Sequence, residues 1–163
     1  MPPSAAMDDA AAFMRQAIAL AQDNIRTGGG GPFGALVVRH GEIVGRGVNR
    51  VTTTHDPTAH AEVVAIRDAC TRLGTFQLTD CTLYTTCEPC PMCLGAIYWA
   101  RLQAVYYACT RHDAAQAHFD DALIYDEIPL DPSARRLPFH PLLRDEAQAL
   151  FTHWLGSDGR VAY

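Results

Sequence analysis

Two short segments constrain the chain more than any other feature of its sequence. They read PTAHAE at residues 57–62 and CEPCPMC at residues 87–93. His60 and Glu62 fall at the start of one predicted helix, and Cys90 and Cys93 are three residues apart at the start of another, which places them on one helix face. Both helices follow loops, so their N-terminal ends can meet at one edge of a sheet. The fold must therefore bring these two helix ends together.

The residues in these segments are typical of a metal site. His60, Cys90 and Cys93 supply one nitrogen and two sulfurs, the ligand types that zinc prefers, and three protein ligands leave a fourth position for water. Helix N-termini stabilise thiolates. Because two thiolates offset the charge of Zn²⁺, the ion should acidify its water less than a site made of histidines. We therefore expect a nearby base, and Glu62 can act as that proton carrier.

Other interpretations of the cysteines remain open. A C-x-x-C pair also occurs in redox sites and as half of a zinc ribbon, but the chain has no second C-x-x-C for a ribbon, and a redox pair would leave His60 and Glu62 without a role. Cys87 could join the three ligands in a closed, structural site, which would make the chain a zinc-stabilised interaction module. Cys87 is predicted to end a strand before the chain turns at Glu88-Pro89, which favours the open site.

Composition narrows the function classes. The chain has 163 residues, enough for one domain with its own core. Its 13 basic residues are all arginine, which excludes Schiff-base chemistry, a pyridoxal anchor and a P-loop lysine. A net charge of −5 argues against non-specific binding to nucleic acid or to a membrane surface.

The N-terminus lacks both a cationic start and an apolar stretch, so we expect no signal peptide, and no apolar run reaches the length of a membrane span. These features predict a cytoplasmic protein with reduced thiols. Its six cysteines then need an explanation other than disulfides.

Hydrophobic periodicity predicts a single α/β domain over residues 1–163. Residues 1–7 are expected to form a loose tail, and a capped helix follows from Asp8 or Asp9 to the glycines at 28–31. Strands are predicted at residues 33–38, 42–48, 81–86 and 104–108, and further helices at 58–73, 90–100, 113–119 and 142–155. Residues 49–57 and the proline-rich stretch before residue 142 are expected to be loops. An opening hairpin followed by alternating helices and strands argues for a three-layer α/β/α fold with a mixed sheet.

The sequence resembles the cytidine deaminase-like zinc superfamily. H-A-E at residues 60–62 with P-C-x-x-C at 89–93 matches the motif of zinc-dependent nucleobase deaminases. Within that superfamily, the strings GGPFGALVV, NRVTTTHDPTAHAE, LYTTCEPCPMCLGAIYWAR and AAQAHFDDALIYDEI resemble the small bacterial guanine deaminases. The likeness runs from about residue 10 to residue 128 and returns at the final tyrosine.

The resemblance implies a role for particular residues. His60, Cys90 and Cys93 match the ligands of one Zn²⁺ per subunit, and Glu62 matches the proton shuttle. The substrate-binding residues that it implies are an amide, a carboxylate, aromatic walls, the alanine beside the ligand and a C-terminal tyrosine: Asn49, Asp121, Phe33, Trp99, Ala61 and Tyr163.

Plainer interpretations of these side chains stay open at this point. Trp99 could be part of the core, Phe33 an ordinary strand residue, Asn49 part of a turn, Asp121 a solvated acid and Tyr163 a frayed end.

The activity that the resemblance implies is hydrolytic deamination of guanine to xanthine and ammonia. The family is a homodimer with an exchanged C-terminal segment, so the tail at residues 156–163 is expected to close over an active site. Related deaminases act on tRNA adenosine, cytosine or guanosine, and these substrates remain alternatives. The acidic charge of this chain argues against a tRNA partner.

Overall fold

The computed structural model describes the backbone of residues 4–163 and side chains from residue 9 onward. The chain divides into two compact units, with the boundary between Asp121 and Ala122. The expectation of a single domain over residues 1–163 stays a prediction.

The first unit is built around a mixed, four-stranded sheet with the order β2-β1-β3-β4. β1 runs antiparallel to both β2 and β3, whereas β3 and β4 run parallel. The strands are β1 (Gly34–Arg39), β2 (Glu42–Val48), β3 (Cys81–Cys87) and β4 (Ala104–Cys109). The start of β1 and the ends of β2, β3 and β4 therefore lie at the same edge of the sheet.

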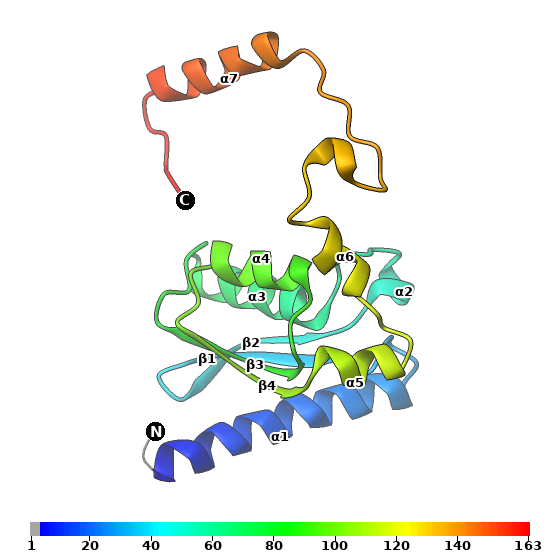
Figure 1. The fold of residues 1–163 in the computed structure, drawn as a ribbon. Helices are drawn as coiled ribbons and strands as arrows, with labels where there is room; N and C mark the ends of the chain where they lie inside the picture. The colour runs from blue at the N-terminus through cyan, green and yellow to red at the C-terminus, as the bar shows by residue number, and fades with distance from the viewer. Residues whose placement is uncertain (1–3) are drawn as a thin grey trace. The chain divides into compact units, whose positions relative to one another are not determined.

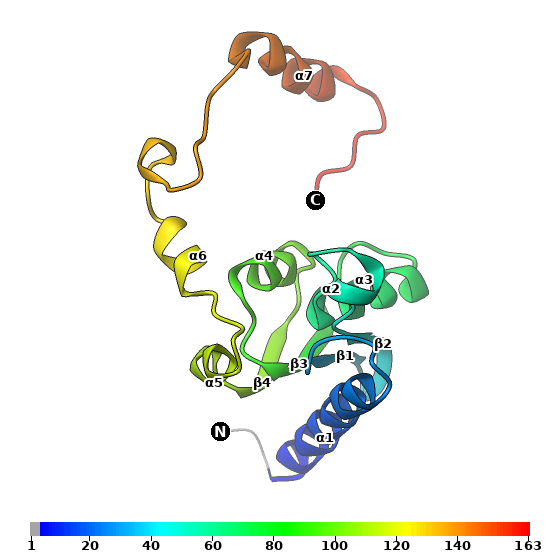
Figure 2. The ribbon, with the colours of Figure 1, turned by 90° about the vertical axis from the view of Figure 1, so that its right-hand side faces the viewer.

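Helices cover both faces of this sheet. α1 (Ser4–Arg26) lies along one face, and α3 (Ala61–Leu73) and α4 (Pro91–Trp99) lie side by side on the other (Figures 1 and 2). The mixed sheet and the three-layer α/β/α architecture predicted from the sequence are confirmed.

Strand alternation explains why two separate clusters form the core. Ala35 and Val37 of β1 join the cluster beneath α3, while Leu36 and Val38 join the cluster beneath α1. Successive side chains of a strand point to opposite faces, so a run of buried apolar residues suits a strand covered on both sides.

The start of α3 is held unusually close to the sheet. Gly47 of β2 faces the first turn of this helix, and a Cβ at that position would overlap the carbonyl oxygen of Ala61. A glycine is required by this close approach of two backbones. Since His60 immediately precedes α3, the same contact fixes where the predicted metal ligand sits.

Two short stretches differ from the expectation. α1 begins at Ser4, within the stretch expected to be a loose tail, because the sequence SAAMDDAAA is rich in strong helix formers; residues 1–3 lie outside the described residues. α3 begins at Ala61 rather than at residue 58, because His60 has an extended backbone.

The structure also contains helices where loops were expected. α2 (Val51–Thr54) is a single turn in the predicted loop 49–57, and α6 (Ala122–Glu127) lies in the stretch expected to be a loop. Both are too short for hydrophobic periodicity to reveal them. α5 (Arg111–Gln116) begins two residues earlier than predicted, because Thr110 and Asp113 form a capping box.

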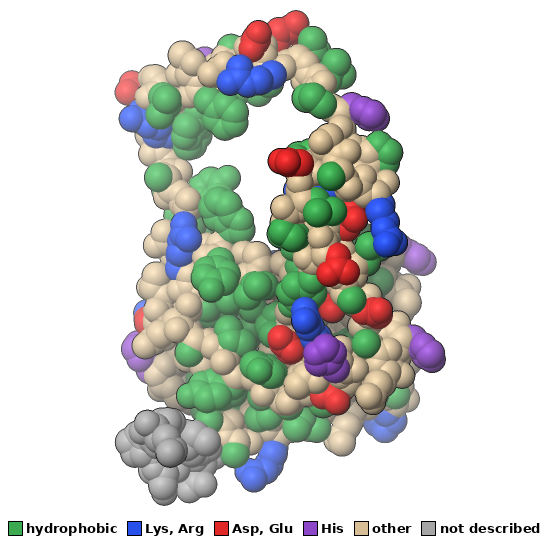
Figure 3. Space-filling model, in the orientation of Figure 1, with side chains coloured by type: hydrophobic (Ala, Val, Ile, Leu, Met, Phe, Trp, Pro, Cys, Tyr) green, Lys and Arg blue, Asp and Glu red, His purple; other side chains and the backbone are tan. Residues whose placement is uncertain are grey.

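The second unit consists of α6, a 3-10 turn (Pro132–Ala134) and α7 (Arg144–Gly156). None of its residues is buried, and Figure 3 shows many hydrophobic side chains at the molecular surface. Within the described part of the chain, no helix has the length and apolar character needed to cross a membrane.

Candidate metal centre and active site

Two helix N-termini position the predicted metal ligands. His60 and Cys90 are the residues immediately before α3 and α4, and both have an extended backbone. Pro91 occupies the first position of α4, where its missing N–H costs nothing. Cys93 then lies in the first turn of α4, on the same side as Cys90. The structure thus brings together the three residues that the sequence predicts as ligands.

The distances from the imidazole of His60 to the two cysteine sulfurs fit a tetrahedral zinc site. His60 Nδ1 lies 3.5 Å from Cys90 Sγ and 3.5 Å from Cys93 Sγ. Zinc bonds of about 2.1 Å to nitrogen and about 2.3 Å to sulfur, at a tetrahedral angle, place the two ligand atoms about 3.6 Å apart. A neutral imidazole nitrogen can accept one hydrogen bond, so two sulfurs at equal distance fit a shared cation better than hydrogen bonding. The residues present therefore fit zinc.

The pKa values of the three candidate ligands depend on one another. The neighbouring Cys93 thiol, together with His60, lowers the pKa of Cys90 to about 4. The Cys90 sulfur and burial raise the pKa of Cys93. Hydrogen bonding to Cys90 raises the pKa of His60. Metal ligation needs thiolate sulfur and neutral imidazole, so binding of a cation would release the protons that Cys93 and His60 hold.

Glu62 lies directly beside this cluster. Its side chain is buried, and its Oε2 is 3.5 Å from Cys93 Sγ. Burial raises the pKa of its carboxyl group, which makes it easier to protonate near neutral pH. A carboxyl group tuned in this way is suited to accept a proton and to return it. The predicted proton shuttle is thus brought next to the predicted ligands.

Cys87 is not part of the same cluster. Among the described residues, the ligating atoms of His60, Cys90 and Cys93 form a group within 4.8 Å of one another, and Cys87 is not a member of it. Its buried thiol donates instead to the carbonyl oxygen of Thr110 at 3.6 Å, and burial raises its pKa to about 11. This placement argues against the closed site with Cys87 as a fourth ligand.

Backbone hydrogen bonds connect two of the predicted substrate residues to the ligand helix. The Asn49 N–H donates to the carbonyl oxygen of Phe33 at 3.1 Å, and the next residue, Arg50, donates to that of Ala59 at 2.9 Å. Ala59 immediately precedes His60. Phe33, Asn49 and the metal ligand therefore occupy one edge of the sheet.

Asp121 and Trp99 are placed less tightly. Asp121 is partly buried, burial raises the pKa of its carboxyl group, and the Cys90 sulfur is near enough to raise it further. Trp99 is 61% exposed, and the Arg101 guanidinium lies 5.7 Å from its ring. The alternative that Trp99 is a core residue of an apolar helix is therefore wrong. Ala61 is completely buried, backbone as well as side chain, so its contact with a ligand stays a prediction.

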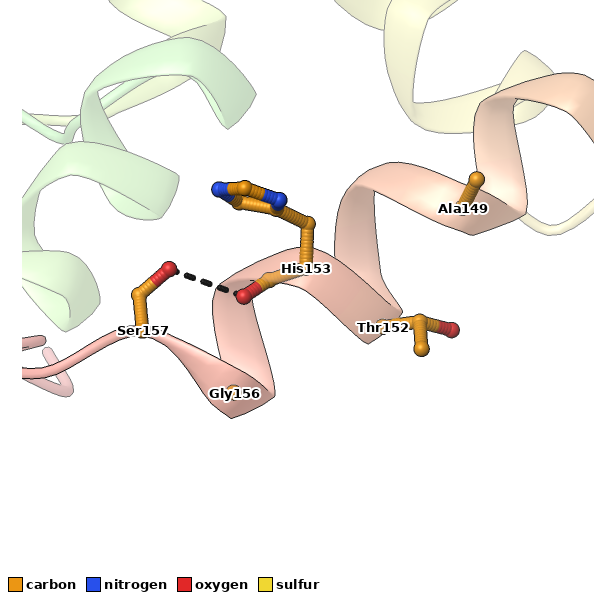
Figure 4. Close-up of a pocket in the computed structure, with 5 residues that line it drawn as sticks. All are labelled: Ala149, Thr152, His153, Gly156 and Ser157. Carbon is orange, nitrogen blue, oxygen red and sulfur yellow. Dashed lines mark hydrogen bonds between the residues drawn. The ribbon is translucent and has the colours of Figure 1, made fainter.

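Tyr163 belongs to the second unit, where it is 73% exposed. Its predicted position over an active site stays a prediction. A pocket in this unit is lined by α7 residues, with Ser157 donating to the His153 carbonyl oxygen at 2.8 Å (Figure 4). It contains none of the predicted site residues.

Sequence reasoning missed two residues that contact the predicted site. Phe119 packs edge-on against Phe33, with ring centroids 4.9 Å apart. Asn24 is buried at the end of α1 and donates hydrogen bonds to the loop before β1 and to Asn49. Nothing in the sequence pairs Phe119 with Phe33, and nothing in it reveals the backbone partners of Asn24.

Comparison with known proteins agrees with this geometry. Residues 7–109 match the family described as the cytidine and deoxycytidylate deaminase zinc-binding region. This range contains the three candidate ligands and Glu62.

Curated and solved proteins extend the match to most of the chain. The guanine deaminase of Bacillus subtilis (strain 168) is 54% identical over 93% of this chain and 97% of its own length. The X-ray structure of guanine deaminase from B. subtilis superposes with a TM-score of 0.91, at 51% identity and with the same coverage. A mutant of NE0047, solved in complex with 8-azaguanine, is 35% identical with a TM-score of 0.65, over 68% of this chain and 64% of its own. The chain therefore belongs to the cytidine and deoxycytidylate deaminase zinc-binding family and, within it, to the guanine deaminases.

Proposed function

We propose that the chain catalyses the hydrolytic deamination of guanine to xanthine and ammonia, using one zinc ion per subunit. The observation that carries the proposal is the position of Glu62, whose carboxylate lies 3.5 Å from one of three side chains that fit a zinc site. The identity with the B. subtilis guanine deaminase and the binding of a guanine analogue, 8-azaguanine, by a further relative support guanine as the substrate.

His60, Cys90 and Cys93 hold the metal in this proposal. Zinc supplies a Lewis acid that makes water a nucleophile near neutral pH. Three protein ligands suit this task because the fourth position stays available to solvent. The imidazole is held at the start of α3 and the two sulfurs at the start of α4, so the fold itself brings the three ligands together.

Glu62 moves the protons of the reaction. Its carboxylate accepts a proton from the attacking water and delivers it to the ring nitrogen adjacent to C2 of guanine. Glu62 then takes a second proton from the hydroxyl group added at C2 and transfers it to the amino group, so that the C2–amino bond breaks and ammonia departs. Water supplies the oxygen of xanthine, so guanine and water give xanthine and ammonia in balance. Its burial keeps the carboxyl group out of bulk solvent during both transfers.

The remaining predicted residues bind and orient the base. Asp121 accepts hydrogen bonds from N–H groups of guanine, and Asn49 hydrogen-bonds the purine. Phe33 and Trp99 pack on the ring faces. Ala61 lies beside His60 at the start of α3 and completes the proposed set of substrate-binding residues. Fixing a flat ring on several sides supplies the orientation that the reaction needs.

We further propose that the working form is a homodimer in which the C-terminal segment is exchanged, with Tyr163 closing an active site. The absence of any buried residue in the second unit supports this, because its apolar side chains require a partner surface. The proposed location is cytoplasmic, which is consistent with the need for reduced ligand thiols.

A substrate screen tests the proposed function. The purified, zinc-loaded protein is incubated with guanine, adenine, cytosine, guanosine and tRNA, and ammonia release is measured with identification of the product. We expect xanthine from guanine and no turnover of the others. Activity confined to guanosine, to cytosine or to tRNA would replace guanine as the substrate. Metal analysis of the same preparation should give one zinc per chain.

A further inference from the structure

Asn24 makes a pair of buried hydrogen bonds that no catalytic step described above uses. It is 6% exposed at the end of α1. Its Nδ2 group donates to the carbonyl oxygen of Gly31 at 3.0 Å and to that of Asn49 at 2.9 Å. A side-chain amide carries two N–H donors, and Asn24 uses one for each of these carbonyl oxygens. Asn24 therefore links the loop before β1 to the residue after β2.

The side chain of Asn49 is held in one orientation within the same network. Its Oδ1 accepts hydrogen bonds from the backbone N–H groups of Gly31 and Val51, each at 3.3 Å. Two N–H donors on one atom require that atom to be the oxygen, which fixes how the amide is turned. The group that Asn49 has left to offer a ligand is its NH₂, a hydrogen-bond donor.

The glycine-rich loop is shaped around these two asparagines. A Cβ on Gly29 would overlap the side-chain oxygen of Asn24. A Cβ on Gly30, which has a φ of 149°, would overlap the carbonyl oxygen of Asn49. Neither position tolerates a side chain, so the loop lies directly against both residues. The loop, Asn24 and Asn49 thus form one packed unit.

We propose that Asn24 is a positioning residue, which holds Asn49 so that its NH₂ group points to a hydrogen-bond acceptor of the purine. The inference rests on the proposed function for the role of Asn49. The acceptor is a ring nitrogen or the carbonyl oxygen of the base. Asn24 itself touches no substrate and acts through the backbone carbonyls of Asn49 and Gly31.

The variant Asn24→Asp gives the first test. It keeps the shape of the side chain but replaces the Nδ2 nitrogen, which carries both N–H donors, with one oxygen that faces two carbonyls. We expect KM for guanine to rise about 10-fold and kcat to change less than about 3-fold, since loss of orientation weakens binding in the ground state and the transition state alike. Asn24→Ser, which retains one hydrogen-bond donor, should give an intermediate KM and guards against misfolding of the first variant.

A matched control lies on the same helix turn. The Thr27 hydroxyl donates to the carbonyl oxygens of Asp23 and Asn24, within α1, and does not reach Asn49. Thr27→Val removes a side-chain hydrogen bond at the same helix end, so it should lower the melting temperature slightly and leave KM unchanged. An equal rise of KM in Thr27→Val would assign the effect of Asn24 to general loosening of the helix end.

A double-mutant cycle decides between positioning and a merely structural role. If Asn24 acts through the amide of Asn49, adding Asn24→Asp to Asn49→Ala should not weaken binding further than Asn49→Ala does alone. Additive losses in the double variant would overturn the proposal. The cycle is measured on KM and, independently of turnover, on the dissociation constant of 8-azaguanine by calorimetry.

The design separates this inference from the proposed function. If the wild-type protein fails to deaminate guanine but acts on another base, the proposed function fails, and the cycle is run on that base. Coupling between Asn24 and Asn49 would then still support the positioning role, and its absence would refute it.

Discussion

The two units of this chain differ in how far their apolar residues are buried. In the first, Ala17, Val37 and Leu83 are completely buried between the sheet and its helices. In the second, residues 122–163, no residue is buried, and Phe151 and Leu150 of α7 are each 71% exposed. A segment of about 40 residues is too short to bury an independent core without help from elsewhere.

The residues proposed to react and the residue proposed to cover the active site lie in different units. Every residue proposed to bind zinc or move protons lies in the unit that has its own core, so that chemistry is positioned by packing within the subunit. Tyr163 lies in the unit that lacks a core. The contribution of Tyr163 therefore depends on the surface that buries the apolar side chains of α7. The proposed exchange between subunits would provide that surface.

The largest expected effect is a loss of activity on substitution of Glu62, which lies in the first unit. Replacing Glu62 with glutamine keeps the size of the buried side chain but removes its ability to carry a proton. We expect kcat to fall about 10³-fold or more, with one zinc per chain retained. Ammonia release and metal analysis on the same sample measure both quantities. Glu42→Gln, an exposed carboxylate at the start of β2, serves as the control for charge and should keep normal activity.

A Glu62→Gln protein with normal zinc and a near-normal rate would contradict the role of this carboxyl group. Loss of zinc together with activity would instead assign Glu62 to the stability of the metal site.

The second prediction tests the unit without a core. Removing residues 157–163 should lower kcat/KM for guanine about 10²-fold, because the proposed closure over the base is lost, while zinc content stays normal. Full activity after truncation would remove Tyr163 from the site. Tyr163→Phe, which keeps the ring and loses the hydroxyl, shows whether the ring or the hydroxyl is responsible.

Mixing two inactive variants then decides whether the tail acts within its own subunit or in its partner. Glu62→Gln chains carry an intact tail, and truncated chains carry an intact Glu62. If the tail crosses between subunits, mixed dimers contain one complete site, and random mixing should restore about one quarter of wild-type activity. If each tail serves its own subunit, the mixture stays inactive.

The same contrast explains what the sequence could predict. The sheet and its helices were predicted because β1 is a short apolar run and α1 has a helical hydrophobic period. H-A-E with P-C-x-x-C indicated the ligand cluster by residue type and spacing alone. α6 was missed because a six-residue helix contains less than two turns of periodic signal. Asn24 was missed because its partners are backbone carbonyls 7 and 25 residues away, and backbone atoms leave no trace in a sequence.

A third, smaller effect concerns the contact that locates His60. Gly47→Ala would force β2 and the start of α3 apart, because the new Cβ overlaps the Ala61 carbonyl oxygen. We expect a loss of about 2–3 kcal/mol in the free energy of unfolding, measured by denaturant titration of the zinc-loaded protein. Zinc affinity should fall as well, since His60 moves with the helix.

Gly95 offers a matched control for this substitution. It lies within α4, and a Cβ there would meet nothing within 4 Å. Gly95→Ala should therefore stabilise the protein by about 0.5–1 kcal/mol, because alanine is the better helix former. Equal destabilisation by the two variants would show that the effect at Gly47 is not caused by the close approach of β2 and α3.

The smallest expected effect is at Cys87, and it distinguishes the open site from a closed one. Its thiol is neutral near pH 7, since burial raises its pKa to about 11, and it donates to the Thr110 carbonyl oxygen. Serine can donate the same hydrogen bond, so Cys87→Ser should keep one zinc per chain and change kcat/KM by less than about 3-fold. Cys90→Ser, three residues further along, should lose zinc and activity together. If Cys87→Ser also lost its metal, Cys87 would be a fourth ligand, no position would remain for the attacking water, and the first unit would hold a structural zinc instead of a catalytic one.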